Sequence, residues 1–154
     1  MLEFQPIVAG ASVIMRNRYL FVYGTLREDV GHEMYHVLAS HAVFVGAATV
    51  RGELYSLGEY PGLVPSQDTT DLIKGELYEI GTDALEHTLS VLDDYEGLGP
   101  GDPLPHEYRR ELVPVTLDDG RHLDAWAYVV NRSLEGLGRI RSGDFAEWRK
   151  SRGA

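Results

Sequence analysis

Alternating hydrophobic and polar positions along the chain predict mostly β-structure. Strands are expected at six segments rich in valine, leucine, tyrosine or alternating apolar positions: residues 19–23, 42–50, 52–57, 72–80, 107–117 and 121–130. Asp119-Gly120 lies between the last two segments and is typical of a β-hairpin turn. Pro114 cannot donate a ladder hydrogen bond, so we expect its strand at a sheet edge or a bulge.

The sequence Gly-Glu-Leu-Tyr occurs twice, at residues 52–55 and 75–78. In a strand, the leucine of each copy lies on the face opposite the glutamate and the tyrosine. We interpret the two copies as similar strands of one curved sheet and not as a repeat fold. Each glycine then marks a bend or a close approach of two backbones.

Two helices are expected between the strands. One covers about residues 31–40, with Met34, Val37 and Leu38 as its apolar stripe. The other opens at residue 82 or 83, where Asp83 and Glu86 have the spacing of a capping box, and it ends near residues 95–97.

Length and composition indicate one globular domain of 154 residues, with 44% hydrophobic and 25% charged residues. No stretch is long and apolar enough to span a bilayer. The chain has no cysteine, which excludes disulfides and thiol nucleophiles and fits a reducing compartment. Glu3 stands where a signal peptide carries basic charge, so we expect a cytoplasmic protein. We further expect a flexible extension over residues 1–17 and a single domain over residues 18–154.

Acidic residues outnumber basic ones by 24 to 14, giving a net charge of −10. This charge repels a phosphate backbone, so a nucleic-acid partner is not expected. A small cationic or zwitterionic ligand fits the charge better.

The segment Tyr23-Gly24-Thr25-Leu26-Arg27 directly follows the first predicted strand. Its glycine lets the backbone turn sharply and approach a ligand, so exposed amide groups could bind an anion. The alternative is an ordinary strand end followed by a solvated loop.

Three carboxylates, Asp93, Asp94 and Glu96, crowd the predicted end of the second helix. The helix dipole and the like charges both disfavour ionisation there, so a partly buried carboxyl would have a raised pKa and could exchange protons near neutral pH. The alternative is a set of exposed acids on a fraying helix end.

A possible zinc motif lies in the first helix, because His32-Glu33-Met34-Tyr35-His36 matches H-E-x-x-H. No second motif supplies an obvious third ligand, so we expect no metal site, and the zinc hydrolase stays an alternative.

Several motifs together resemble the γ-glutamylcyclotransferase-like (AIG2-like) family over about residues 18–148. In type and order the matching segments are residues 23–27, Tyr-Pro-Gly-Leu-Val at 60–64, Leu-Asp-Asp-Tyr-Glu-Gly at 92–97, Tyr-Arg-Arg at 108–110, Ala-Trp-Ala-Tyr at 125–128, and Ile140 with Ser-Gly-Asp at 142–144. The resemblance implies a mixed α/β (α+β) fold, with a small curved sheet or barrel and a few flanking helices.

The resemblance also implies an enzyme that cyclises a γ-glutamyl amine or peptide to 5-oxoproline and releases the amine. It places the acid/base role on Glu96 and substrate binding on Tyr23, Gly24, Thr25 and Leu26, to which we add Arg27 at the entrance. Tyr55 and Tyr128, on strands expected to face the cavity, are further candidates for substrate binding, with core packing as their alternative.

The resemblance implies no cofactor and a small-molecule γ-glutamyl substrate, and it leaves the leaving amine and the oligomeric state open. The alternatives to this function are a non-catalytic binding module for an amino-acid-like ligand and the zinc hydrolase of His32 and His36.

Overall fold

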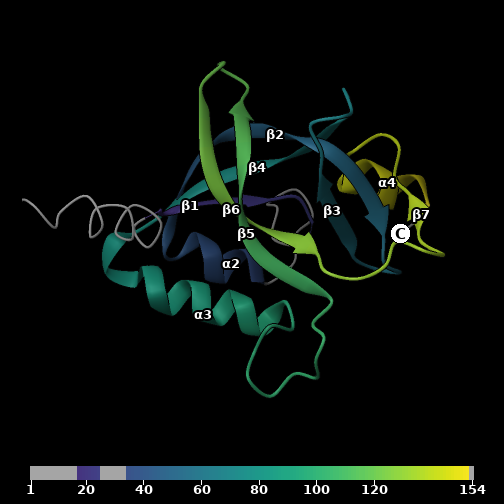
Figure 1. Ribbon diagram of the computed structural model, residues 1–154. Helices are drawn as coiled ribbons and strands as arrows, with labels where there is room; N and C mark the ends of the chain where they lie inside the picture. Colours follow the sequence, from purple (N-terminus) through teal and green to yellow (C-terminus); the bar gives the residue numbers. More distant parts are fainter. Residues whose placement is uncertain (1–16, 25–33, 153–154) are drawn as a thin grey trace, which may run out of the picture.

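A seven-stranded sheet forms the centre of the computed structural model, which describes residues 17–24 and 34–152 (Figure 1). The elements follow in the order β1 (Tyr19–Val22), α2 (Met34–Ala39), β2 (Ala42–Ser56), β3 (Pro61–Pro65), β4 (Leu72–Ile80), the 3-10 turn η3 (Thr82–Ala84), α3 (Leu85–Tyr95), β5 (Tyr108–Leu117), β6 (His122–Val130), β7 (Gly138–Arg139) and α4 (Phe145–Ser151).

The sheet closes on itself. Its strands are ordered β1-β4-β2-β3-β6-β5, and β1 also pairs in parallel with β6 through Leu20 and Trp126. A second parallel pairing joins β3 to β6 at Leu63 and Val129, whereas the other pairings are antiparallel. Strands β1, β4, β2, β3 and β6 therefore form a mixed five-stranded barrel, which confirms the predicted fold class.

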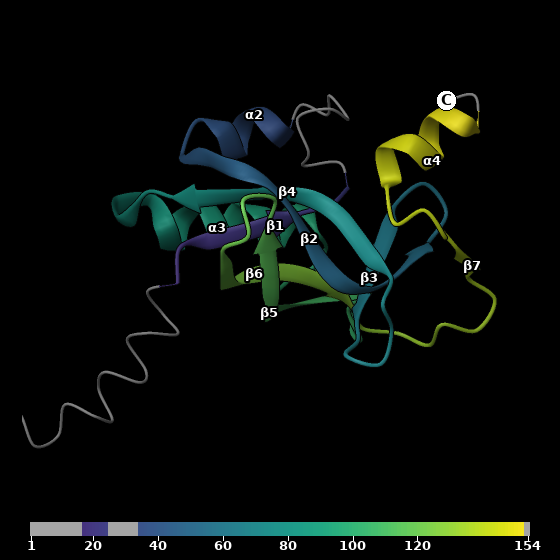
Figure 2. The same cartoon turned by 90° about the horizontal axis from the view of Figure 1, so that it is seen from above.

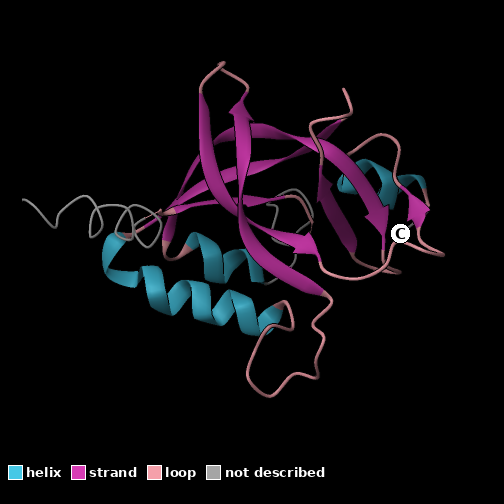
Figure 3. Cartoon of the chain, viewed as in Figure 1, coloured by secondary structure: helices cyan, strands magenta, loops and turns pink. Residues whose placement is uncertain are grey.

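Period-2 alternation along the strands gives the structure two hydrophobic cores. In β1, Phe21 points into the barrel, while Leu20 and Val22 point outward to a second core that includes Leu89 and Leu92 of α3. Helices α2 and α3 lie toward one end of the sheet, and α4 lies at the other end beside β7 (Figures 1 and 2). The colouring of Figure 3 shows the strands between these two groups of helices.

All six predicted segments contain strand, with ends that agree to within one residue except at one place, and the structure adds β3 and β7. The segments 42–50 and 52–57 form the single strand β2, because Gly52 pairs with Pro65 in the ladder with β3 and does not lie at a break. A Cβ at Gly52 would lie 2.4 Å from the Val64 oxygen, and one at Gly75 would lie 2.3 Å from the Val22 oxygen. The expected close approach of backbones at both glycines is therefore confirmed.

The second predicted helix begins differently from its sequence pattern. A 3-10 turn precedes α3, the N-cap of α3 is Ala84, and no side chain caps either element. The capping box expected from Asp83 and Glu86 is therefore wrong. Helix α2 ends at Ala39, and the predicted start of this helix lies outside the described residues.

The chain segment before β1 is described only from Asn17 onward. Asn17 accepts a hydrogen bond from Trp126 Nε1 at 3.0 Å and donates one to the Asp124 oxygen, so it is attached to β6. The predicted extension otherwise lies outside the described residues. Among the helices that the structure describes, none has the length and apolar character needed to cross a membrane.

Candidate active site

The end of α3 places Glu96 at its C-cap. Gly97 follows with φ of +85°, its N–H donates to the Asp94 oxygen, and the Leu98 N–H donates to the Asp93 oxygen. These two bonds form a Schellman motif, which requires the left-handed backbone that glycine adopts most easily. The sequence Tyr-Glu-Gly therefore ends the helix and fixes the backbone of Glu96.

Glu96 lines a cavity between the C-terminal end of α3 and the barrel. The cavity encloses about 370 Å³ of empty space, counting its open mouth. Its lining residues are Phe21, Val22, Tyr23, Gly24, Tyr60, Pro61, Glu96, Tyr108 and Tyr128. Mostly aromatic and apolar walls with a few polar groups are typical of small-molecule sites.

The Glu96 carboxyl has a pKa near neutral pH. Burial raises its pKa from the ordinary value of 4.5 to about 7, with a further contribution from the negative charge of Asp93. Among the described residues, no group donates a hydrogen bond to this carboxyl that would offset the cost of its burial. The group can therefore both take up and release a proton at pH 7.

Asp93 connects α3 to the sheet. Its two carboxylate oxygens accept from Nε and Nη2 of Arg110 at 2.8 and 3.2 Å, and Tyr128 Oη donates to Oδ1 at 2.7 Å. The Arg110 guanidinium in turn lies 4.6 Å over the ring of Trp126. The helix end that carries Glu96 is thus attached to both β5 and β6.

Two further phenols hold the start of β3 against the cavity. Tyr108 Oη donates to the Pro61 oxygen at 2.6 Å, and Tyr23 Oη donates to the Tyr128 oxygen while accepting from the Leu63 N–H at 3.1 Å. Burial, followed by nearby negative charge, raises the pKa of all three phenols, Tyr23, Tyr108 and Tyr128. They therefore act as neutral hydrogen-bonding groups.

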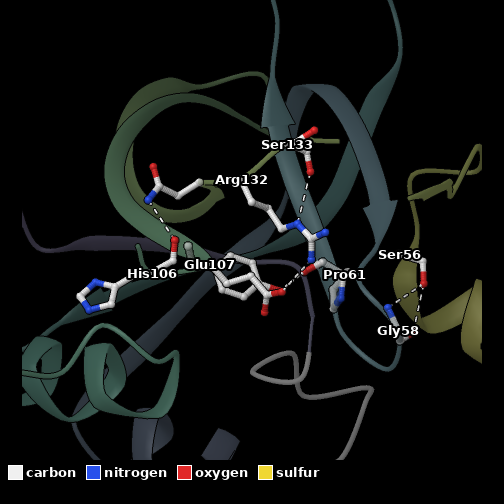
Figure 4. A network of polar contacts seen from close by, with 9 residues as sticks. Ser56, Gly58, Pro61, His106, Glu107, Arg132 and Ser133 are labelled. Carbon is white, nitrogen blue, oxygen red and sulfur yellow. Dashed lines mark hydrogen bonds and ion pairs between the residues drawn. The ribbon is translucent and has the colours of Figure 1, made fainter. Parts of the chain in front are cut away.

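The surroundings of Pro61 are held by a network of polar contacts (Figure 4). The hydroxyl of Ser56 donates to the Gly58 oxygen at 3.0 Å in the turn before β3, and Glu107 forms an ion pair with Arg132 at 3.2 Å. Tyr60 lies in the same turn, is 54% exposed and lines the cavity. The turn therefore holds an aromatic side chain where the cavity meets solvent.

The structure brings together four of the predicted site residues: Tyr23, Gly24, Glu96 and Tyr128 all line the cavity. Gly24 has no positive φ, but a Cβ there would lie 2.8 Å from Pro61 Cγ. Close packing, and not backbone conformation, therefore explains the glycine at this position. Thr25, Leu26 and Arg27, the other predicted residues of this segment, lie outside the described residues.

Tyr55 does not line this cavity. Its hydroxyl donates instead to Glu53 Oε1 at 2.8 Å. Sequence reasoning also missed Tyr108, which the structure places beside Glu96. The signal available was the Tyr-Arg-Arg segment at residues 108–110, whose alternation puts Tyr108 and Arg110 on one face of a strand.

The possible zinc motif, kept as an alternative, is described only in part. His32 lies outside the described residues, and His36 is exposed on α2 with its ring 5.2 Å from that of Tyr35. Within residues 17–24 and 34–152, no three His, Cys, Asp or Glu side chains are grouped to hold a metal ion.

Comparison with known proteins identifies the family of this fold and cavity. Residues 20–150 match the model of the family described as gamma-glutamyl cyclotransferase, AIG2-like. The gamma-glutamylcyclotransferase family protein YtfP of Escherichia coli is 34% identical over 129 residues, which are 83% of this chain and 96% of that protein.

Two further relatives extend this comparison. Gamma-L-glutamyl-butirosin B gamma-glutamyl cyclotransferase of Niallia circulans is 36% identical over 115 residues, 73% of this chain and 67% of that protein. The crystal structure of YkqA from Bacillus subtilis superposes with a TM-score of 0.66 at 28% identity, covering 90% of this chain and 43% of that one. The chain therefore belongs to the gamma-glutamyl cyclotransferase, AIG2-like family of cyclotransferase-type enzymes.

Proposed function

We propose that this protein converts the γ-glutamyl group of an amine or peptide to 5-oxoproline and releases the amine, with Glu96 as the general acid and base. The observation that carries this proposal is the Glu96 carboxyl, which lines the cavity, is partly buried and has its pKa raised to about 7. A relative named for the cyclisation of gamma-L-glutamyl-butirosin B supports the substrate class.

The reaction needs one proton carrier and a folded substrate. The carboxylate of Glu96 takes a proton from the substrate's α-ammonium, and the free amine attacks the γ-carbonyl carbon. A carbon–nitrogen bond forms to close the five-membered ring and leaves the ring nitrogen with two hydrogens and a positive charge. The bond to the leaving nitrogen breaks as Glu96 returns the first proton to that nitrogen. The second proton of the ring nitrogen passes through Glu96 to the released amine, which leaves as an ammonium. Neither water nor another reactant is consumed.

The cavity contributes by holding the substrate in the reactive conformation. An intramolecular attack in a well-oriented complex can lower the barrier by about 7–11 kcal/mol at best. Gly24 and Pro61 both line the cavity, and a Cβ at Gly24 would lie 2.8 Å from Pro61 Cγ, so this part of the wall is closely packed. Main-chain amides of the segment that begins at Gly24 bind the α-carboxylate or the developing oxyanion in this proposal.

A screen of γ-glutamyl compounds for 5-oxoproline release tests the function. Glu96→Gln should lower the rate by about 10²–10⁴-fold, because the amide keeps the shape but cannot carry the proton. The matched control is Asp94→Asn, which removes an exposed carboxylate from the same helix end and should leave the rate within about twofold.

Two results would count against the proposal. A Glu96→Gln variant within about tenfold of the wild-type rate would refute the acid/base role. Absence of 5-oxoproline release from every γ-glutamyl compound, with amino-acid-like ligands still bound, would favour a binding module.

A further inference from the structure

The first part of β2 has a partner strand on one side only. Residues 42–51 pair with β4 on that side. On the opposite side β5 reaches β2 at the Ala47 oxygen, which accepts from the Asp118 N–H, and at the two residues that follow, and β3 pairs further along the strand. Within the described ranges 17–24 and 34–152, no strand pairs with this second side of Ala42–Gly46.

The ladder directs main-chain groups toward the side without a strand. In an antiparallel pair, successive residues point their N–H and C=O groups alternately toward the partner strand and away from it. The His41 oxygen accepts from the Gly81 N–H on the β4 side, so Ala42 and Phe44 point these groups away from β4. A bulge directly after Phe44 interrupts the alternation. We call Ala42–Phe44 the open edge of β2.

The open edge is apolar and exposed. Val43 is 70% exposed and Phe44 is 52% exposed. The run from residue 42 to residue 48 has no charged side chain, although the whole chain has a net charge of −10. Glu79 stands opposite Val43 in the ladder with β4, and an ion pair with Arg18 neutralises its charge. An exposed, uncharged strand edge is a template for pairing with another strand.

A second edge of the sheet shows how proteins prevent such pairing. Among the described residues, β5 has no strand beside residues 108–115 on the side away from β6. This edge carries the charged side chains Arg109 and Glu111, and Pro114 removes a main-chain donor. Charges and proline protect strand edges from association. The open edge of β2 has neither.

We propose that the open edge is the interface through which two copies of this chain associate, as an antiparallel pair of β2 strands related by a two-fold axis at Val43. In this register Ala42 of one copy lies opposite Phe44 of the other copy, and the reverse. The outward main-chain groups of each such pair exchange two hydrogen bonds. Val43 stands opposite its own counterpart, where apolar side chains on paired strands are closest.

A second copy of the chain is the occupant that the open edge fits. A two-fold axis makes an interface of one surface with itself, so each copy supplies the same exposed apolar residues and the same outward groups. The ion pair of Arg18 with Glu79 leaves no net charge beside Val43, whereas the acidic surface elsewhere repels another copy. An edge of this length buries less area than the roughly 1,200 Å² of a standard interface, so the dimer is weak.

Sedimentation equilibrium of the full chain tests the association. The average mass should rise from monomer toward dimer between about 1 μM and 1 mM, the range of weak complexes. Val43→Lys places like charges opposite each other and should lower the association constant by about tenfold or more. Leu72→Lys is the matched control, because Leu72 is also an apolar strand residue, is 49% exposed and lies at the far end of β4. It should leave the association constant unchanged.

A cysteine variant tests the register. The chain has no cysteine, so Val43→Cys provides a single thiol in each copy. Opposed residues that exchange no hydrogen bonds have Cα atoms about 4.5 Å apart, a separation that a disulfide can span. With oxidised glutathione as the oxidant, Val43→Cys should form a reducible covalent dimer several-fold faster than Leu72→Cys, the matched control.

Three results would overturn the inference. One is a protein that stays monomeric up to about 1 mM, and another is a dimer whose association constant is unchanged in Val43→Lys. The third is equal rates of covalent dimer formation in Val43→Cys and Leu72→Cys.

The salt dependence distinguishes this interface from association of oppositely charged surfaces. Each chain has a net charge of −10, so sodium chloride should strengthen association at the uncharged open edge. Weaker association in salt would assign the contact to opposite charges and overturn the inference. None of Ala42, Val43 and Phe44 lines the cavity, and the association is measured without substrate, so its outcome is independent of the proposed function.

Discussion

Replacing Glu96 with glutamine should stabilise the protein at alkaline pH while it removes activity. The folded protein holds the Glu96 carboxyl at a pKa of about 7, against an ordinary value of 4.5. Each pKa unit corresponds to about 1.4 kcal/mol, so ionising this buried group lowers the free energy of unfolding by about 3 kcal/mol in all.

The sign and the pH range follow from the raised pKa. Below pH 4.5 the carboxyl is protonated in both states and costs nothing, and between pH 4.5 and 7 the unfolded chain releases its proton first, so stability falls. About 2 kcal/mol of this loss falls between pH 5.5 and pH 8. Glutamine does not titrate, so its own burial cost is equal at both pH values.

The assay is unfolding of wild type and Glu96→Gln at pH 5.5 and pH 8. The stability of the variant relative to wild type should rise by about 2 kcal/mol between these pH values, which is about 4 to 8 °C in Tm for a chain of this size. Asp94→Asn, which removes an exposed carboxylate, should show no such change. Identical pH dependence in wild type and Glu96→Gln would show that the Glu96 carboxyl is solvated, and the reasoning would fail.

Three further predictions concern the same helix end and the cavity. The rate constant kcat/KM should rise with pH through a midpoint near 7. Asp93→Asn should move this midpoint to lower pH, because it removes a negative charge that raises the pKa of Glu96. An unchanged midpoint in Asp93→Asn would show that the Asp93 charge does not affect Glu96. Gly97→Ala should lower the free energy of unfolding by about 1–2 kcal/mol, because residue 97 has a φ of +85°. Gly101→Ala, at a position with open space and no positive φ, should lower it by less than half as much, and urea unfolding measures both. Gly24→Ala should reduce kcat/KM by more than its loss of Tm explains, since the new methyl would lie 2.8 Å from Pro61 Cγ; normal kinetics in the folded variant would refute this.

Elements with clear periodicity could be predicted from the sequence, and elements formed by tertiary pairing could not. Strand β3 carries Pro61, Gly62 and Pro65, which all lower strand propensity, yet it forms because β2 and β6 pair with it on either side. Helix α4 did carry a signal. Asp144 is its N-cap and accepts a hydrogen bond from the Glu147 N–H at 3.2 Å, but the basic residues that follow hide the short apolar pattern of this helix.

The residues of the candidate site also differ in whether local sequence or tertiary packing determines their position. The helix end that carries Glu96 could be predicted because its carboxylates and Gly97 are local features of the sequence, and the resemblance to the family singles out Glu96 among them. Tyr55 and Tyr128 both lie on strands, but only barrel closure decides that Tyr128 reaches the cavity. The partnership of Asp93 with Arg110 joins residues 17 positions apart on a helix and a strand, and it depends on packing that the sequence pattern does not specify.

The short strand β1 makes the cavity a late product of folding. Its four residues pair with β4 on one side and with β6 on the other, so Leu20 must find Trp126 across more than a hundred residues of chain. Closing so long a loop is entropically costly and slow compared with forming the neighbouring hairpins. A nascent chain therefore has no cavity until β6 has left the ribosome, and recovery of ligand binding during refolding would time the closure of the barrel.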